Sequence, residues 1–185
     1  MTNVEKRLKE SKSQFVEKIA DNMHAFGVSE TIGRVLGIIY MNREPMTLDQ
    51  LSEATGMSKM RMSQVVREMI ELNIAKKVFR KGVRKDLIQV EDDYYQTFIS
   101  LFTSNWQRAV TKSRSFERKL QKDLETIELD DSLSKEVIEE KKELDWETKE
   151  WSDYYDWINR LIEFFESGEI FEHVPINERG NKNDK

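Results

Sequence analysis

The stretch from Thr47 to Gln89 reads TLDQLSEATGMSKMRMSQVVREMIELNIAKKVFRKGVRKDLIQ, and it decides the fold of this chain. Thr47 and Gln50 form a capping-box pattern, in which each side chain can bond to the backbone of the other at the start of a helix. Gly56 suits the left-handed end of that short helix, and Ser58 suits the cap of the next one. Apolar residues then recur at helical spacing and are expected to face the core: Met62, Val65, Val66, Met69 and Leu72. Two short helices joined by a tight glycine turn predict a helix-turn-helix.

The second predicted helix leaves a polar face outside the core, mostly near its N-terminus. In a helix-turn-helix, the second helix reads the major groove of DNA with residues near its start. We therefore expect Arg61, Gln64 and Arg67 to lie at or near base edges, and Lys59 and Ser63 to contact phosphates. The full set of DNA contacts expected on this helix is Ser58, Lys59, Arg61, Ser63, Gln64 and Arg67.

A β-hairpin is expected to follow this helix. After Asn73 the helical period ends, and residues 74–80 and 86–90 are predicted as two strands around the basic segment 81–85. Such a hairpin beside a helix-turn-helix is a wing. Its cations are expected to hold the DNA backbone or enter the minor groove: Arg80, Lys81, Arg84 and Lys85.

The distribution of charge favours a nucleic-acid partner. From Lys59 to Lys85 there are nine Lys or Arg and two Glu, a net charge of +7, whereas the whole chain carries −5 and the remaining residues therefore −12. A positive module on an acidic protein is typical of a protein that binds the phosphate backbone of double-stranded DNA. The alternative interpretation is a solvated amphipathic helix followed by an ordinary charged hairpin.

Neither the composition nor the motifs indicate an enzyme. The 185 residues include no cysteine, which excludes disulfides, thiolate metal sites and cysteine nucleophiles. His24 and His173 lie in no metal-ligand spacing, and no phosphate-binding glycine motif occurs. We expect no catalytic residue, no metal and no cofactor. Because the longest apolar run, Val35 to Met41, is too short for a bilayer and no signal peptide pattern opens the chain, we expect a cytoplasmic protein.

The fold class predicted from the whole pattern is mainly α with a small β-hairpin wing. Long helices are predicted at 2–26, 30–42, 94–128 and 133–166. The expected domains are an N-terminal dimerisation helix at 1–28, a winged helix-turn-helix DNA-binding domain at 29–92, a C-terminal long-helix dimerisation and effector region at 93–177, and a disordered tail at 178–185. The apolar stripe of the first helix is expected to meet another subunit; the alternative is that it packs on its own domain. Gly33 and Gly37 are expected to let another helix approach closely.

Aromatic residues gather in three places: near the N-terminus, on the predicted helix 94–128 and on the predicted helix 133–166. Aromatic rings at helical spacing usually form core. They can also form a cage for a quaternary ammonium, which the faces of Trp and Tyr attract by about 0.5–2 kcal/mol per ring. Acidic neighbours such as Asp153 and Asp156 would reinforce such a cage, and the sequence alone leaves both interpretations open.

Several of these segments resemble one known family. The run GRVLGIIYMNREPMTLDQLSEATGMSKMRMSQVVREMIELNIAKKVFRKGVRK, followed by YYDWINRLIEFFESGEIFEHVPI, is similar to the GbsR-type branch of the MarR-like winged helix-turn-helix repressors. The resemblance covers roughly Phe15 to Pro175. It implies a homodimeric repressor of genes for the uptake of choline or related osmoprotectants, or for the synthesis of glycine betaine, bound to operator DNA. A pocket between the DNA-binding lobe and the helical region is implied as the site of a quaternary ammonium effector, with Tyr40, Phe98, Phe102 and Trp106 as its expected lining.

A protein-interaction adaptor is the rival function. In that case the winged module would be a docking surface for another protein and would not bind DNA sequence-specifically. The six positive charges between Lys76 and Lys85 argue for DNA, because a protein-docking wing does not require them.

Overall fold

The computed structural model describes residues 2–129 and 132–177. The chain forms two compact units, residues 1–105 and 106–185, and the boundary falls inside one long helix. The tail expected at 178–185 lies outside the described residues.

The first unit begins with two helices packed against each other. Helix α1 (Asn3–Asn22) is capped by Thr2 and continues as a 3-10 turn, η1 (Met23–Phe26), so the expected helix 2–26 tightens in its last turn. Helix α2 (Glu30–Asn42) follows. A Cβ atom added at Gly33 would lie 2.7 Å from the Cα of Ala20, and one added at Gly37 would lie 3.1 Å from the Cα of Val16. The expected close approach at the two glycines is therefore confirmed, and the helix that approaches is α1.

The apolar stripe of α1 divides into two parts. Its C-terminal half packs on α2, where Val16 and Ala20 are buried. Nearer the N-terminus, Val4, Leu8 and Phe15 are exposed at the spacing i, i+4 and i+11, which places them on one side of the helix. Packing on the same domain, the alternative interpretation, thus accounts for the second half of the helix only.

The helix-turn-helix forms as its capping signals predict. Helix α3 (Leu48–Thr55) begins with the capping box. The Thr47 hydroxyl accepts from the backbone N–H of Gln50 at 3.2 Å, and the side-chain amide oxygen of Gln50 accepts from the backbone N–H of Thr47 at 2.8 Å. Gly56 ends it in the left-handed region at φ 68°. Helix α4 (Lys59–Glu71) begins at its cap Ser58. The five apolar residues expected to face the core are all buried in one cluster with α2 and the sheet.

The wing belongs to a three-stranded antiparallel sheet. Strands β2 (Ala75–Val78) and β3 (Leu87–Val90) are shorter than predicted, because the residues at the hairpin tip do not pair. A two-residue strand, β1 (Met46–Thr47), pairs with β3 and gives the strand order β1-β3-β2. The sequence indicated no strand at 46–47, because two residues are too few to show a strand period.

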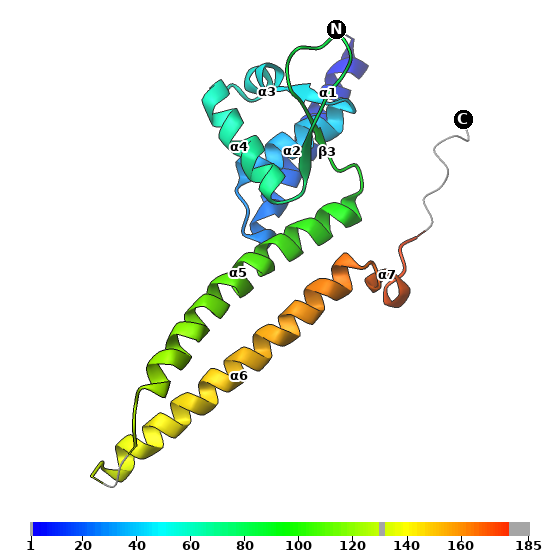
Figure 1. Ribbon diagram of the computed structural model, residues 1–185. Helices are drawn as coiled ribbons and strands as arrows, with labels where there is room; N and C mark the ends of the chain where they lie inside the picture. Colours follow the sequence, from blue (N-terminus) through cyan, green and yellow to red (C-terminus); the bar gives the residue numbers. More distant parts are fainter. Residues whose placement is uncertain (1, 130–131, 178–185) are drawn as a thin grey trace. The chain divides into compact units, whose positions relative to one another are not determined.

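The second unit is a helical hairpin (Figure 1). Helix α5 (Tyr94–Glu125) starts in the first unit and ends three residues before its predicted end. Helix α6 (Lys135–Glu166) is capped by Ser134 and not by Ser132, and a short helix α7 (Ile170–His173), which was not predicted, follows it. The small apolar core of the hairpin joins α5 to α6 and consists of Val110, Tyr155, Ile158 and Ile162, with Trp106 packed against them.

The fold class is thus confirmed as mainly helical, with a small antiparallel sheet in the winged helix-turn-helix and a long C-terminal hairpin. None of the helices within residues 2–129 and 132–177 is both long and apolar enough to cross a membrane.

Candidate nucleic-acid interface

The N-terminal part of α4 presents the polar residues that were expected to contact DNA. Lys59, Arg61, Gln64 and Arg67 are exposed, while Ser63 is half-buried. The hydroxyl of the cap, Ser58, accepts from the backbone N–H of Arg61 at 3.2 Å. Since the helix dipole and the remaining free N–H groups also make a helix N-terminus attractive to anions, this end of α4 suits a phosphate or an acceptor edge of a base.

The tip of the wing presents the second group of cations. Arg80, Lys81, Arg84 and Lys85 are all exposed. The N–H of Val83 donates to the carbonyl of Arg80 at 3.0 Å and closes the turn at the tip. The four side chains therefore project from a short, closed loop.

Asp49 joins the recognition helix to the wing. One oxygen of its carboxylate accepts from the Nζ of Lys59 at 2.5 Å, and the other accepts from the Nζ of Lys85 at 2.5 Å. Hydrogen bonds from these two ammonium groups lower the pKa of Asp49 to about 2. The start of α4 and the wing are consequently close enough for one anionic group to contact both.

Two further carboxylates lie against wing cations. Glu44 pairs with Arg80 at 2.5 Å, and Asp86 pairs with Lys77 at 2.7 Å. Among the residues expected to bind DNA, the cations Lys59, Arg80 and Lys85 thus have carboxylate partners within the first unit. The sequence does not indicate these partners, since Glu44 and Asp49 lie more than thirty residues from the wing in the chain.

A small aromatic pocket lies in the first unit. Its volume is about 210 Å³, and its lining includes Ile19, Phe26, Tyr40, Tyr94 and Phe98. The Tyr40 hydroxyl and the Thr97 hydroxyl are 2.8 Å apart and share a hydrogen bond. Burial, with the nearby acidic groups, raises the pKa of Tyr40 to about 12, so its side chain is neutral at physiological pH.

Two of the four residues expected to line an effector site line this pocket. Tyr40 and Phe98 line the aromatic pocket, where Tyr94 stacks edge-on against Tyr40 with ring centroids 5.2 Å apart. Phe102 stacks on Phe98 with ring centroids 6.3 Å apart, but it is not part of the lining of the aromatic pocket. Trp106 belongs to the second unit and packs against the core of the hairpin. Phe26 and Tyr94, which were not among the expected residues, complete the aromatic wall.

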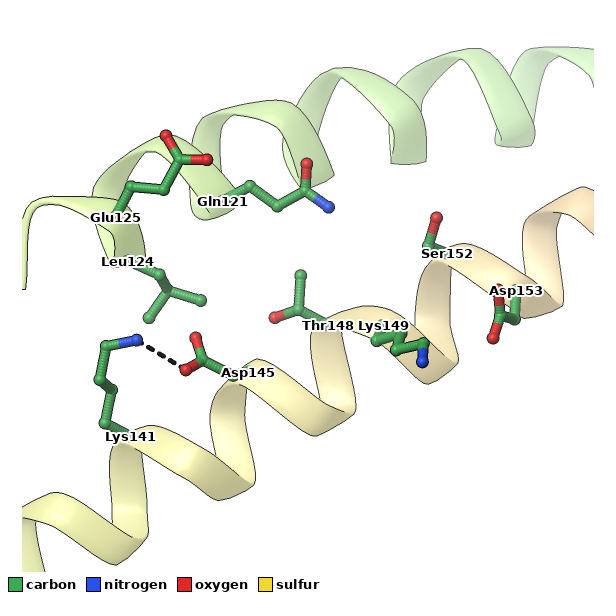
Figure 2. A pocket seen from close by; sticks show the side chains of 9 residues that line it. All are labelled: Gln121, Leu124, Glu125, Lys141, Asp145, Thr148, Lys149, Ser152 and Asp153. Atoms are coloured by element: carbon green, nitrogen blue, oxygen red, sulfur yellow. Dashed lines mark hydrogen bonds and ion pairs between the residues drawn. The ribbon is translucent and has the colours of Figure 1, made fainter.

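The hairpin has a groove of about 450 Å³ with a different chemistry (Figure 2). Lys141 and Asp145 form an ion pair at 2.6 Å on one side of it. The other residues of its lining are polar or charged apart from one leucine: Gln121, Leu124, Glu125, Thr148, Lys149, Ser152 and Asp153. Because no aromatic side chain lines it, this groove cannot supply the ring faces that bind a quaternary ammonium.

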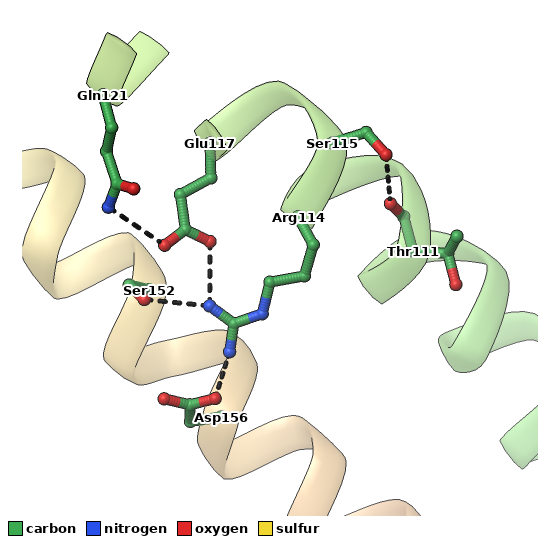
Figure 3. A network of polar contacts seen from close by, with 7 residues as sticks. All are labelled: Thr111, Arg114, Ser115, Glu117, Gln121, Ser152 and Asp156. Carbon is green, nitrogen blue, oxygen red and sulfur yellow. Dashed lines mark hydrogen bonds and ion pairs between the residues drawn. The ribbon is translucent and has the colours of Figure 1, made fainter. Parts of the chain in front are cut away.

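A polar network joins the two helices of the hairpin (Figure 3). Arg114 of α5 donates to Glu117 at 2.8 Å, to Ser152 of α6 at 2.8 Å, and to Asp156 of α6. Only 6% of the surface of Glu117 is exposed. Burial by itself would raise the pKa of Glu117, but hydrogen bonds with Ser152 and Arg114 outweigh it and lower that pKa. The carboxylate is therefore ionised and compensated, which is a structural role, and nothing in the network pairs a nucleophile with a base.

A metal site is also lacking in what the structure describes. Within 2–129 and 132–177, no three or more side chains of His, Cys, Asp or Glu are grouped so as to hold a metal ion. The candidates for a functional site are therefore the cationic surface of α4 and the wing, and the aromatic pocket.

Comparison with known proteins agrees with the fold of both units. The family description "GbsR family transcriptional regulator, C-terminal helical hairpin" matches residues 94–172. The HTH-type transcriptional repressor OpcR of Bacillus subtilis (strain 168) is 60% identical over 168 residues, which cover 91% of each chain. The HTH-type transcriptional repressor GbsR of the same organism is 31% identical over 169 residues, covering 91% of this chain and 93% of that one.

One solved structure shares the fold at low sequence identity. It is described as a transcriptional regulator and aligns with a TM-score of 0.52 and 16% identity, over 81% of this chain and 99% of that chain. The sequence identity to OpcR and GbsR over nearly the full length of all three proteins, together with the matched hairpin, establishes the family. The chain belongs to the GbsR family, whose members are transcriptional regulators and not enzymes.

Proposed function

We propose that this protein is a homodimeric repressor that binds a near-palindromic operator and controls genes for the uptake or synthesis of osmoprotectants such as choline and glycine betaine. It acts in the cytoplasm, on DNA, through α4 and the wing. Repression by the relatives OpcR and GbsR, stated in their names, supports the proposal, as does the family resemblance of the sequence. The observation that carries its DNA-binding part is the double contact of Asp49 with Lys59 and Lys85.

That double contact supports a single DNA-binding surface. The two ammonium groups come from the start of α4 and from the wing, yet they reach the same carboxylate. A DNA phosphate is also a compact anion, so a phosphate near this position can contact both elements at once. With the backbone held in this way, the exposed Arg61, Gln64 and Arg67 are available for base edges in the major groove.

Arg61→Ala tests this assignment, with Arg160→Ala as its control. Both residues are exposed and both changes remove one positive charge, but Arg160 lies on α6. We expect Arg61→Ala to cost about 1–3 kcal/mol on the cognate operator and to relax sequence preference. Arg160→Ala is expected to leave the preference unchanged. Fluorescence anisotropy with the DNA upstream of the neighbouring gene and with a scrambled duplex measures both quantities.

The result also separates the proposal from the adaptor function. Equal affinity and equal selectivity of the two variants would contradict the role of α4 as the recognition helix. No salt-dependent binding of the wild-type protein to any duplex would favour the protein-docking wing.

An exposed apolar stripe on α6 supports the homodimer. The buried face of α6 packs in the hairpin core, but Trp146, Tyr154 and Trp157 follow the spacing i, i+8 and i+11 on another face and are exposed, Trp146 by 58% and Trp157 by 51%. Monomeric proteins rarely leave so many aromatic rings on one face. A second copy of the hairpin would cover this stripe, and the exposed N-terminal half of α1 would add to the interface.

Sedimentation equilibrium of Trp157→Glu tests the dimer. The charge is expected to dissociate the dimer, because an unpaired carboxylate at an apolar interface is costly to desolvate. Phe79→Glu is the control: Phe79 is exposed by 89% on the wing, where the second copy is not expected. A dimer of unchanged affinity in Trp157→Glu would place the interface elsewhere.

The aromatic pocket is the proposed effector site. Its volume of about 210 Å³ suits a ligand smaller than a drug-sized molecule, whose pockets span about 300–1,000 Å³. Phe26, Tyr40, Tyr94 and Phe98 provide ring faces for a quaternary ammonium. Glu91 and Asp92 lie near enough to Tyr40 to contribute to its raised pKa, so the field at the pocket favours a cation. Binding there would change the spacing of the two recognition helices in the dimer.

Calorimetric titration with choline and with glycine betaine tests the effector site. Tyr94→Ala should weaken binding about 2-fold to 30-fold, because it removes one ring worth about 0.5–2 kcal/mol. Tyr95→Ala is the matched control, since Tyr95 is the exposed neighbour that does not line the pocket. If neither ligand releases or absorbs heat on titration at millimolar concentrations, and neither changes the melting temperature of the protein, this part of the proposal is eliminated.

A further inference from the structure

Asp49 differs from the other carboxylates beside the cationic surface. Glu44 and Asp86 each pair with one cation, and both of those cations belong to the wing or its strands. Asp49 pairs with Lys59 of α4 and with Lys85 of the wing, one on each carboxylate oxygen. It lies in the first turn of α3, the helix that crosses the DNA backbone in a helix-turn-helix.

Resting on the DNA-binding function proposed above, we infer that Asp49 is a built-in competitor of the DNA phosphate. By occupying Lys59 and Lys85, its carboxylate lowers the affinity of the protein for every duplex, whatever the base sequence. Asp49 is therefore a determinant of how strongly the repressor holds non-operator DNA.

The geometry carries the inference because the carboxylate already makes the contacts that a phosphate would make. Each ammonium of Lys59 and Lys85 lies 2.5 Å from an oxygen of Asp49. A phosphate that contacts these ammonium groups competes with the carboxylate for their N–H donors, and the carboxylate stays as a negative charge next to the DNA. Since both lysine side chains are more than half exposed, the pairs are weak and can exchange partners without unfolding.

The effect is expected to be independent of sequence because phosphate contacts carry no base information. Weaker binding to all duplexes shortens the time spent on non-operator DNA, while base contacts from α4 preserve the preference for the operator. The opposite role is a clamp that holds the wing in its DNA-binding position. A clamp predicts weaker binding when Asp49 is neutralised, so the two roles differ in the sign of the effect.

The experiment compares Asp49→Asn with Asp86→Asn by fluorescence anisotropy on a mixed-sequence duplex and on the operator region. Both variants remove one negative charge near the surface, but Asp86 pairs with Lys77, which is not among the expected DNA contacts. At 50 mM potassium chloride, Asp49→Asn is expected to bind both duplexes about 3-fold to 30-fold more tightly than wild type. Asp86→Asn shows how much the loss of any nearby negative charge raises the affinity for DNA, and its increase in affinity should stay well below that of Asp49→Asn.

Salt dependence gives a second readout. Each phosphate contact adds about −0.9 to the slope of log affinity against log salt, so the release of two lysines steepens that slope by about 1 to 2. The advantage of Asp49→Asn should consequently shrink by up to about tenfold between 50 and 200 mM salt. In a Lys59→Gln, Lys85→Gln background, Asp49→Asn should give no more than the gain of Asp86→Asn, because the released cations are absent.

The outcomes distinguish the inference from the function on which it rests. Tighter, more salt-sensitive binding by Asp49→Asn that disappears in the double-lysine background supports the inference. The inference is overturned if the wild type binds DNA and Asp49→Asn weakens that binding, or strengthens it no more than Asp86→Asn does. Either result leaves the repressor function standing. Absence of duplex binding by both the wild type and Asp49→Asn overturns both.

Discussion

Gly33→Ala should destabilise the first unit, and the contact between α1 and α2 gives the size of the effect. The added Cβ would lie 2.7 Å from the Cα of Ala20 and 3.0 Å from the carbonyl oxygen of Ile19, besides contacting the Cγ of Met23. Met23 is a buried residue of the core, so its Cγ has little room to move. The two backbone atoms can move only if the helices separate, and that separation disturbs the core on both sides.

Two opposing terms decide the magnitude. Inserting a methyl group into a packed helix contact costs about 1–3 kcal/mol. Alanine in a helix is more favourable than glycine by about 1 kcal/mol. Because the clash is with backbone, the upper half of the first range applies, and we expect a net loss of about 1–2 kcal/mol in the free energy of unfolding.

Gly37→Ala is the matched control one turn further along α2. There the added Cβ would lie 3.1 Å from the Cα of Val16, so a shift of a few tenths of an ångström suffices. The gain in helix propensity then roughly cancels the strain, and a change within about 0.5 kcal/mol is expected. Urea unfolding followed by circular dichroism measures both variants. Equal stability of Gly33→Ala and wild type, or greater damage from Gly37→Ala, would refute the reasoning.

Two other predictions concern charged groups. Arg114→Met should destabilise the hairpin by about 1–3 kcal/mol at pH 7, since it removes a partner of the buried Glu117 carboxylate. The pKa of Glu117 is lowered in the folded protein, so this loss should diminish as pH falls below 4.5 and Glu117 protonates; urea midpoints at pH 7 and pH 3 measure it. For Asp49, carboxyl carbon NMR should show a folded pKa of about 2, returning toward 3.8 when Lys59 and Lys85 are both replaced by Gln. Because that pKa is depressed on folding, the pairs stabilise the protein above pH 3.8 and cease to do so as pH falls through about 2; an unshifted titration in the wild type would contradict the double contact.

The elements of this protein follow from local sequence. Thr47 and Gln50 specify the start of α3, Gly56 its end, and Ser58 the start of α4, because a cap depends on residues three positions apart. The buried face of α4 and the two long helices follow from apolar spacing in the same way. Four features that involve only a few residues were predicted wrongly or not at all: the 3-10 turn η1, the short strand β1, the cap of α6 and the helix α7.

The cationic residues of the candidate site were identified from the sequence, but their partners were not. Whether Glu44 meets Arg80 and Asp49 meets Lys85 depends on how the wing folds back on the helix-turn-helix, a contact between residues more than thirty positions apart. The same holds for the aromatic pocket, whose lining includes the expected Tyr40 and Phe98 together with Phe26 and Tyr94, which are distant in the chain.

The sequence by itself determined which segments are helices, which faces are apolar and where positive charge accumulates, since each of these depends on neighbours within about one turn of helix. Only the tertiary structure decided that one carboxylate lies between Lys59 and Lys85 and which rings share a pocket. Those arrangements result from packing between elements distant in the chain, and residue spacing within one element carries no information about them.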